Sequence, residues 1–283
     1  RMKIFNNKKD LKDCLLDYKT NKKTIGFVPT MGALHEGHLS LIENAKLKND
    51  IVVVSIFVNP TQFDNVEDLK QYPKTIENDI KLLKSVSCDI LFSPSVKEIY
   101  SENIASEKFN FDGLEHQMEG AFRKGHFDGV GTIVKTLFEI IEPNKAYFGQ
   151  KDFQQLQIVK KMVDKYDLNV TVKGCPIYRE ENGLAMSSRN ARLSKEQKEA
   201  GPFIYRTLNK IQQKFDTENI TKINEWLENE FKKQPLLTLE YFTIADEKTL
   251  KTAKNKDANK TYRAFIAVFA GDIRLIDNIA LKN

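Results

Sequence analysis

The 283-residue chain has few cysteines, and it lacks both C-x-x-C pairs and long apolar runs. Its three cysteines, Cys14, Cys88 and Cys175, lie far apart, which indicates neither a zinc site nor a redox pair. Three is also a poor number for a secreted disulfide framework, so a reducing, cytoplasmic location is favoured. No stretch reaches the roughly 18 apolar residues of a membrane span. The N-terminal stretch has no apolar core of a signal peptide.

A strong charge of one sign is also missing. Forty-four lysines and arginines against 39 acidic residues give a net charge of +5, and the lysines are scattered along the chain. This mild excess fits an enzyme with anionic substrates, and it lacks the clustered basic surface of a nucleic-acid-binding protein. What the chain does have is 41% hydrophobic residues, enough for the core of one large domain or two ordinary ones.

Short apolar runs alternate with amphipathic stretches up to about residue 172. We predict strands at 24–30, 51–60, 88–94 and 145–150, and helices at 38–48, 130–141 and 153–166. The run at 51–60 is rich in β-branched residues, as in a strand buried on both faces of a parallel sheet. This alternation predicts an α/β fold with a doubly wound, Rossmann-like parallel sheet.

The character of the sequence changes near Cys175. A polar loop leads into a helical run at 195–215, where Pro202 either starts a new helix or kinks the run. Two strands are expected after it, at 237–246 and 262–279, the second broken at Ala270–Gly271. We therefore predict two domains, a larger one over residues 1–176 and a smaller α+β domain over 177–283.

The segment PTMGALHEGH, residues 29–38, lies at the end of the first of these predicted strands. In an open parallel sheet, ligands bind beyond the carboxyl ends of the strands. Gly32 lets the backbone turn and approach a ligand closely. His35 and His38 share one face of the helix that begins here. Two imidazoles at a helix N-terminus make a site for phosphate, and for charge that develops during phosphoryl or nucleotidyl transfer.

Two other interpretations of these histidines stay open. With Glu36 between them they faintly resemble a zinc-binding helix, but the spacing is not H-E-x-x-H and no third ligand is visible. They could also be incidental to a capped helix start. The chain has only four histidines, and half of them fall within these four positions, which favours a function.

The H-x-G-H signature of residues 35–38 resembles that of the nucleotidylyltransferase superfamily, which includes class I aminoacyl-tRNA synthetases and small cytidylyl- and adenylyltransferases. Over nearly its full length the chain is similar to the pantothenate synthetase (pantoate–β-alanine ligase) family. The matching segments, in the family's order, are PTMGALHEGHLSLI, VSIFVNPTQF, QYPKTIENDI, RKGHFDGV, AYFGQKDFQQLQIV, GLAMSSRN and RLIDNI.

The resemblance implies a two-step reaction. ATP and (R)-pantoate give pantoyl adenylate and pyrophosphate with the help of Mg²⁺, and the amine of β-alanine then attacks the acyl adenylate to give pantothenate and AMP. It further implies a homodimer with small-molecule substrates. Together with the composition described above, we expect a cytoplasmic protein with no nucleic-acid or membrane partner and no metal held by protein ligands. The first domain would bind nucleotide and pantoate, and the second would close over the nucleotide as a lid.

The resemblance assigns ATP binding to three segments. Their residues are Met31, Gly32, Ala33, Leu34, His35, Glu36, Gly37 and His38; Gly149, Gln150, Lys151 and Asp152; and Ile177, Met186, Ser187, Ser188 and Arg189. The candidates for catalysis among them are His35, His38, Lys151, Ser187, Ser188 and Arg189. His38 matches the family's proton donor, which supports the departing pyrophosphate. Without the resemblance, Met31 reads equally well as core packing, and Asp152 and the two serines as helix caps.

Four residues match the region of the organic substrates: Asn59, Gln62, Arg123 and Gln155. Gln62 follows a buried strand, and its amide can donate and accept, which suits a carboxylate flanked by hydroxyls. Gln155 matches the second pantoate ligand, and its neighbour Gln154 should point about 100° away on a helix. Asn59 could instead belong to a turn, and Arg123 to a structural salt bridge.

Other positions are expected to be structural or depart from the family. Asp79 should support the histidines from behind, and RLIDNI should be a buried strand and turn. Gln150 stands where the family usually has Glu, and Lys124 where it often has Pro.

Three rival functions remain. Another nucleotidylyltransferase, making a dinucleotide or a CDP-activated alcohol, would not need the two glutamines or MSSRN. A tRNA-charging protein would need an anticodon-binding domain and a basic face. An inactive scaffold is disfavoured because the other expected site residues are present.

Overall fold

The computed structural model describes residues 1–282, which form two compact units. The first unit comprises residues 1–115, 119–150 and 155–176. The second comprises residues 116–118, residues 151–154 and the chain from Ile177 onward. Each unit has its own sheet, so the two are described in turn.

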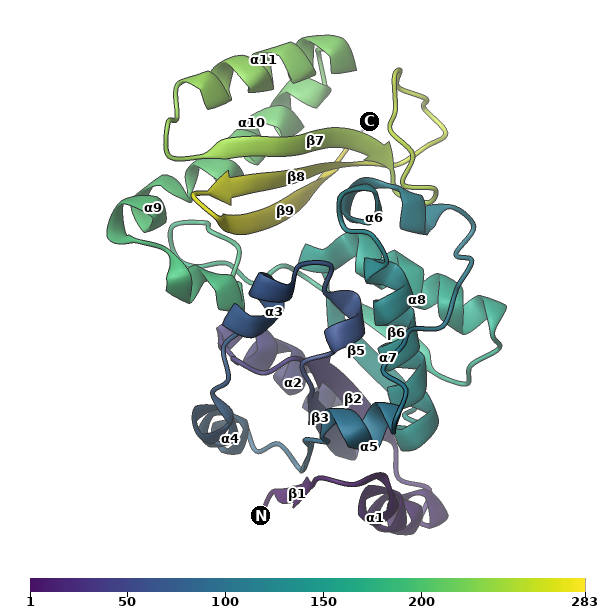
Figure 1. The fold of residues 1–283 in the computed structure, drawn as a ribbon. Coiled ribbons are helices and arrows are strands. Elements are labelled where there is room, and N and C mark those ends of the chain that lie inside the picture. The colour runs from purple at the N-terminus through teal and green to yellow at the C-terminus, as the bar shows by residue number, and fades with distance from the viewer. Residues whose placement is uncertain (283) are drawn as a thin grey trace. The chain divides into compact units, whose positions relative to one another are not determined.

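A six-stranded parallel sheet forms the centre of the first unit (Figure 1). Its strands are β1 (Lys3–Phe5), β2 (Ile25–Thr30), β3 (Ile51–Ile56), β4 (Ile90–Phe92), β5 (Lys145–Gly149) and β6 (Thr171–Cys175), in the spatial order β1-β4-β3-β2-β5-β6. Val52, Val53 and Val54 of β3 are fully buried, as expected for a strand covered on both faces.

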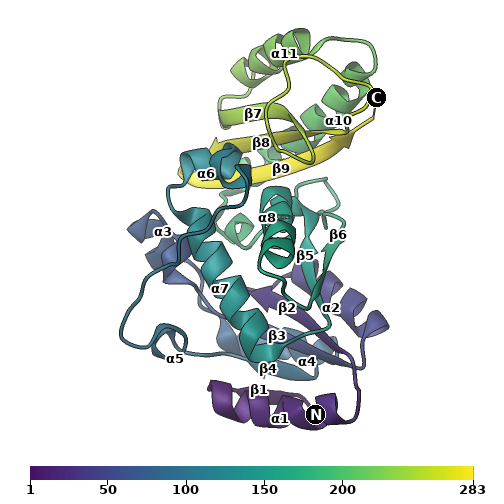
Figure 2. The same cartoon turned by 90° about the vertical axis from the view of Figure 1, so that its right-hand side faces the viewer.

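Helices cover both faces of this sheet (Figure 2). On one face lie α1 (Lys8–Thr20) and α7 (His126–Ile141), where Phe138 packs edge to face against Phe27 of β2 with 6.2 Å between ring centroids. On the other lie α2 (Glu36–Lys48) and α4 (Ile76–Ser85), in one core cluster with Val28. The remaining helices of the N-terminal half are α3 (Val66–Gln71), α5 (Val96–Tyr100), α6 (Met118–Phe122) and α8 (Phe153–Lys165), with short 3-10 turns η1 (Pro60–Gln62), η2 (Leu114–His116) and η3 (Gln150–Asp152).

The strand order changes direction between β2 and β5. From β2 the chain runs outward through β3 to β4, and from β5 it runs to β6 on the other side. In open α/β sheets, ligands bind outside the carboxyl ends of the strands at such a switch point. The loop of residues 31–35 leaves β2 there and Gln150 leaves β5 there, so two of the predicted ATP segments start at this edge.

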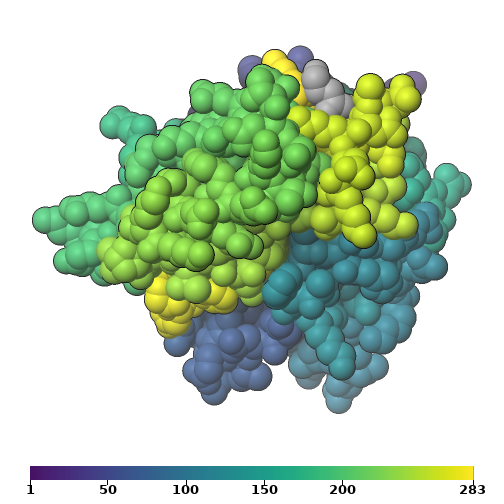
Figure 3. Space-filling view, turned by 90° about the horizontal axis from the view of Figure 1, so that it is seen from above, coloured from purple at the N-terminus to yellow at the C-terminus, as the bar shows by residue number. Residues whose placement is uncertain are grey.

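The second unit is built on a three-stranded antiparallel sheet of β7 (Thr238–Asp246), β8 (Tyr262–Ala270) and β9 (Ile273–Leu281). Its helices are η4 (Ser188–Arg192), α9 (Lys195–Ala200), α10 (Phe203–Phe215) and α11 (Ile220–Lys232). Figure 3 looks onto α10 and α11, whose apolar residues form one core with the sheet. Pro202 is the N-cap of α10 and thus starts a new helix, and Gly271 turns the chain between β8 and β9 with φ 64°. The predicted fold class is confirmed in both its parts.

Candidate active site

His35 is the N-cap residue of α2, and it forms a reciprocal capping box with His38. The backbone N–H of Gly37 donates to His35 Nδ1 at 3.1 Å, and the backbone N–H of His35 donates to His38 Nδ1 at 3.2 Å. The two ring centroids lie 4.0 Å apart. Each imidazole therefore satisfies a backbone donor that the start of a helix leaves without an intrahelical partner.

These caps determine where the histidines carry their protons. Nδ1 accepts a hydrogen bond in both rings, so the neutral imidazole holds its proton on Nε2. Nε2–H is thus the donor end of each ring. The helix-cap and functional interpretations of the histidines are compatible. Capping uses Nδ1 of each ring, and Nε2 is left to contact a ligand.

The Asp79 carboxylate on α4 holds the loop in front of α2. Asp79 is 1% exposed, and it accepts from the backbone N–H of Ala33 at 3.0 Å and of Leu34 at 2.9 Å. Gly32 and Ala33 have left-handed backbone conformations, with φ 80° and 50°, and the second is uncommon for a residue with a side chain. Asp79 therefore supports the histidines through the backbone of their loop.

These hydrogen bonds also show which N–H groups of the loop already have an acceptor inside the protein. The N–H of Gly32 donates to Thr30 Oγ1 at 3.1 Å, and those of Ala33 and Leu34 are taken by Asp79. These three amides are engaged inside the protein. The imidazole Nε2–H groups are therefore donors that this segment can offer to phosphate in addition to its remaining amides.

Gln62 closes the η1 turn after β3 and is 8% exposed. Asn59, 1% exposed, donates from Nδ2 to Gln62 Oε1 at 3.1 Å and to the Gly129 carbonyl at 3.0 Å. Its Oδ1 accepts from Thr61 Oγ1 at 3.1 Å and from the Tyr100 hydroxyl at 2.5 Å. The amide of Asn59 is thus engaged with protein partners, and Asn59 lies beside Gln62 as its hydrogen-bond partner.

The start of α7 packs directly against Gln62. A Cβ atom on Gly129 would lie 2.5 Å from the Gln62 backbone N and Cα, so this position has room only for glycine. His126 Nδ1 lies 2.8 Å from the Gln62 carbonyl oxygen. Neither Gly129 nor Tyr100 was expected at this site from the sequence, because their contacts join segments about 40 to 70 residues apart.

The other two residues assigned to the organic substrates have different surroundings. Gln155 is half-buried on α8, whereas Gln154 is 4% exposed and donates to the Gln117 carbonyl at 2.7 Å. Arg123 Nη1 lies 3.4 Å from Glu119 Oε1, and its side chain is 19% exposed. The ion pair with Glu119 matches the salt-bridge alternative for Arg123.

In the second unit, the Lys151 backbone is bound to strand β9. The Lys151 carbonyl accepts from Asn278 Nδ2 at 2.9 Å. Asn278 Oδ1 accepts in turn from Arg263 Nη1 at 2.8 Å, and Arg263 Nε lies 3.0 Å from Glu247 Oε1. The RLIDNI segment is therefore more than a buried strand, since its Asn278 holds one of the predicted ATP segments.

A narrow cavity in this unit brings Lys151 together with Ser187, and Asn190 and Asp277 also line it. Ser187 is the N-cap of η4, and its Oγ accepts from the Arg189 N–H at 3.2 Å. Met186, just before it, donates its N–H to the Tyr178 carbonyl at 3.0 Å.

Asp277 forms a two-pronged ion pair with Arg179, with distances of 2.7 and 2.9 Å. Burial raises the pKa of Asp277, and the Arg179 guanidinium opposes that rise. The pair fixes β9 beside the segment that carries Ser187, and so stabilises this wall of the cavity.

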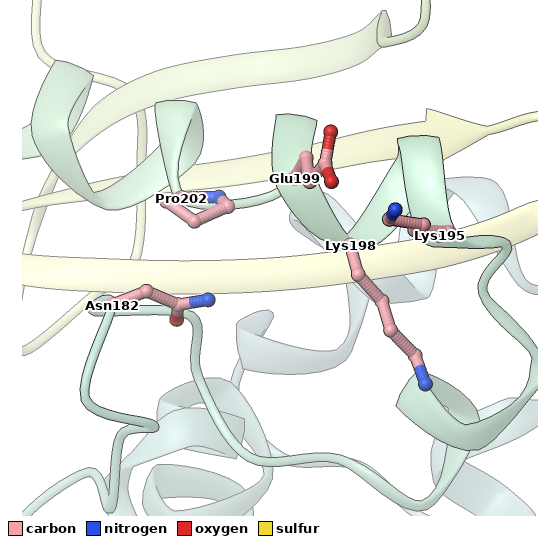
Figure 4. A pocket seen from close by; sticks show the side chains of 5 residues that line it. All are labelled: Asn182, Lys195, Lys198, Glu199 and Pro202. Carbon is pink, nitrogen blue, oxygen red and sulfur yellow. The ribbon is translucent and has the colours of Figure 1, made fainter.

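A metal centre and a membrane-spanning helix are both missing from residues 1–282. No group of three or more His, Cys, Asp and Glu side chains there could hold a metal ion, and no helix there is long and apolar enough to cross a membrane. A surface pocket of the second unit is lined by Asn182, Lys195, Lys198, Glu199 and Pro202 (Figure 4). Lys198 and Glu199 extend in opposite directions there, so the polar groups do not converge.

Comparison with known proteins identifies the family. The model of the pantoate-beta-alanine ligase family matches residues 3–280, almost the whole chain. The chain belongs to the pantoate-beta-alanine ligase family. The resemblance inferred from the sequence segments is thus confirmed, and with it the assignment to the ligases.

Relatives and solved structures of this family agree over the full length. The chain is 54% identical to pantothenate synthetase of Christiangramia forsetii over 283 residues, 100% of both chains, and 46% identical to that of Bacteroides fragilis over 281 residues, 99% of both. The crystal structure of the Thermus thermophilus pantothenate synthetase superposes with a TM-score of 0.91 at 38% identity, covering 98% of this chain and 99% of that one. That of the Francisella tularensis ligase, complexed with beta-gamma ATP and beta-alanine, gives 0.83 at 36% identity, covering 99% and 98%.

Proposed function

We propose that this chain condenses (R)-pantoate with β-alanine at the expense of ATP, forming pantothenate, AMP and pyrophosphate through pantoyl adenylate. The observation that carries the proposal is the histidine pair at the start of α2. Nδ1 of His35 and of His38 each accepts a backbone N–H, which leaves Nε2–H as the donor end of the neutral ring, and the pair follows the strand at the switch point of the sheet. Membership of the family supports the choice of substrates, as does the Francisella structure with its two ligands.

In the first step, a pantoate carboxylate oxygen attacks the α-phosphorus of ATP and pyrophosphate leaves. Negative charge grows on the bridging oxygen as its bond to phosphorus breaks. The Nε2–H of His38 donates to that oxygen, and His35 binds the neighbouring phosphate. Donors already fixed in place stabilise such charge without reorganising, and here the capping box fixes both rings.

Lys151 and Arg189 add positive charge to the nucleotide site. Lys151 is a mobile point charge whose backbone is held by Asn278, and the guanidinium of Arg189 can bind two phosphate oxygens at once. Ser187 and Ser188 supply hydroxyls, and backbone groups of the three ATP segments bind the rest of the nucleotide. Mg²⁺ fits as an ion that arrives with the triphosphate, because such ions use mainly substrate phosphates and water as ligands. It would neutralise phosphate charge.

Gln62 and Gln155 bind pantoate. In the second step, the β-alanine amine attacks the acyl carbon of the adenylate, AMP leaves, and the amine nitrogen loses a proton. Arg123 borders this region while paired with Glu119, and Asn59 contributes through Gln62. Homodimer formation, suggested by the family resemblance, and a cytoplasmic location, suggested by the few scattered cysteines, complete the proposal. Sedimentation velocity tests whether the chain forms a dimer.

Exchange of labelled pyrophosphate into ATP tests the first step by itself. We expect exchange that needs pantoate and does not need β-alanine. His38→Ala should lower its rate roughly a hundredfold, the usual effect of losing one donor to a developing anion. His116→Ala, which removes an exposed histidine outside the proposed site, should leave the rate unchanged. Exchange that ignores pantoate would contradict the proposed substrate, and equal rates in the two variants would contradict the role of His38.

A further inference from the structure

We propose that Tyr100 is a positioning residue for pantoate, which acts through Asn59 to keep the Nε2 end of the Gln62 amide directed to the substrate. The inference rests on the proposed role of Gln62 as a pantoate ligand. Tyr100 ends helix α5, 41 residues along the chain from Asn59, and no sequence signal linked it to the site.

The hydrogen bonds of Asn59 determine the orientation of its own amide. The hydroxyl oxygens of Tyr100 and Thr61 lie 2.5 Å and 3.1 Å from the atom at one end of this amide. These two hydroxyl oxygens lie 2.8 Å from each other. The other end lies 3.0 Å from the Gly129 carbonyl, which can only accept. The second end must therefore be Nδ2 and the first Oδ1, and the Tyr100 and Thr61 hydroxyls, which can either donate or accept, stabilise this orientation by donating to Oδ1.

That orientation is passed on to Gln62. The Nδ2 group of Asn59 is a donor, so the atom of Gln62 that it meets at 3.1 Å must be the acceptor Oε1. Nε2, with its two N–H donors, is the other end of the Gln62 amide. Two donors suit the carboxylate and hydroxyl oxygens of pantoate. If the amide were turned the other way, Gln62 Oε1 would face the carboxylate oxygens, and two acceptors cannot form a hydrogen bond.

Tyr100 is suited to this task because it stays a donor. Burial raises the pKa of its hydroxyl, so the group remains protonated throughout the pH range in which the enzyme is assayed. Asn59 is 1% exposed, and water cannot replace the lost donor without entering a packed site. Removing the hydroxyl leaves Oδ1 with Thr61 alone.

The test compares Tyr100→Phe with Tyr147→Phe by steady-state kinetics of the complete enzyme. Tyr147 is the control, because its hydroxyl also contacts an asparagine amide in the same unit, accepting from Asn49 Nδ2 at 2.8 Å. We expect Tyr100→Phe to raise the KM for pantoate about three- to tenfold, the usual effect of one buried hydrogen bond, with the KM for ATP changed less than about twofold. Tyr147→Phe should change neither. Equal changes in both KM values, or no change in the pantoate KM, would overturn the inference.

A double-mutant cycle with Asn59→Asp separates positioning from a mere loss of structure. An aspartate at this position has no N–H to donate to Gln62. If Tyr100 acts only through Asn59, Tyr100→Phe will add little to the pantoate KM in the Asn59→Asp background. Fully additive effects would overturn the inference. Loss of pantoate-dependent pyrophosphate exchange in the unaltered enzyme would instead contradict the proposed function itself, so the two failures are distinguishable.

Discussion

The two units hold their site loops by opposite means. In the first, a buried carboxylate, Asp79, accepts from two backbone N–H groups of the histidine loop. In the second, an amide, Asn278, donates to one backbone carbonyl, that of Lys151. In both cases a side chain from elsewhere in the sequence binds the backbone of a loop in the proposed site and leaves the side chains of that loop to the proposed ligand. Asp79 accepts from two backbone N–H groups whereas Asn278 donates to one carbonyl, so the loss of Asp79 should cost more stability.

Removing Asp79 should have the largest effect. Asp79→Ala removes the carboxylate that accepts from the Ala33 and Leu34 N–H groups, beside the left-handed Gly32–Ala33 turn. We expect the free energy of unfolding to fall by about 2–5 kcal/mol and kcat/KM for ATP to fall at least tenfold. The control is Asp50→Ala, because Asp50 accepts from the Thr24 N–H at 2.8 Å just before the start of β2, far from the histidines along the strand. Equal losses of kcat/KM for ATP in Asp79→Ala and Asp50→Ala would contradict the claim that Asp79 acts by supporting the histidine loop.

Removing the Asn278 side chain should have a smaller and more selective effect. Asn278→Ala loses the bond to Lys151 and leaves Arg263 with Glu247 as its remaining partner in this chain of bonds. We expect the KM for ATP to rise about three- to tenfold, the effect of one hydrogen bond. Gln212→Ala is the matched control, since Gln212 also donates to a backbone carbonyl of β9, that of Ala280 at 2.8 Å. A similar rise in the control would show that the effect is a general loosening of β9.

The proposed pantoate site extends the comparison to a segment held by close packing. Gly129→Ala would push a methyl group against the Gln62 backbone, and we expect about 1–3 kcal/mol less stability and a higher KM for pantoate. Gly131→Ala, on the same helix, would meet the Phe111 ring at 2.9 Å instead. It should lower the melting temperature without changing the pantoate KM. A higher pantoate KM in Gly131→Ala, with an unchanged pantoate KM in Gly129→Ala, would mean that Gly129 does not position Gln62.

The smallest effect is expected for a surface pair outside both loops. The hydrogen bond from Lys19 lowers the pKa of Glu142, whose side chain is 70% exposed. The contribution of the pair to stability is therefore present above the ordinary pKa of 4.5 and is lost as the pH falls through the lowered value in the folded protein. Because both groups are near water, the effect should stay below about 1 kcal/mol. Thermal melts of Glu142→Gln and of the unaltered protein at pH 7 and pH 3 measure this contribution to stability. Turnover at pH 7 should be the same in both proteins.

The sequence predicted the parts of this molecule that have long, regular patterns. The β-branched run of β3 and the apolar stretch of α7 identified the sheet and its helices. The three-residue strand β1 and the partly exposed strand β6 were not predicted, because each lacks such a run and depends on a neighbouring strand. The histidines, glutamines and MSSRN were found because they lie in contiguous segments.

The residues that hold those segments could not be found in the same way. Tyr100 reaches Asn59 across 41 residues, and Asn278 reaches Lys151 across 127. Such pairs depend on how the helices and strands pack, which no local pattern records. One signal was present, since Asp277 and Asn278 are adjacent buried polar residues in a mostly apolar strand, and buried polar residues usually have a specific partner.

The central claim, that this chain joins pantoate to β-alanine through an adenylate, is tested most directly by AMP release with each component omitted in turn. The account predicts pyrophosphate with ATP, Mg²⁺ and pantoate, and sustained AMP release only when β-alanine is also present. Pyrophosphate without AMP after addition of β-alanine would show that the amine acceptor is wrong. AMP release that continues without pantoate would contradict the account, because no pantoyl adenylate could then lie on the path.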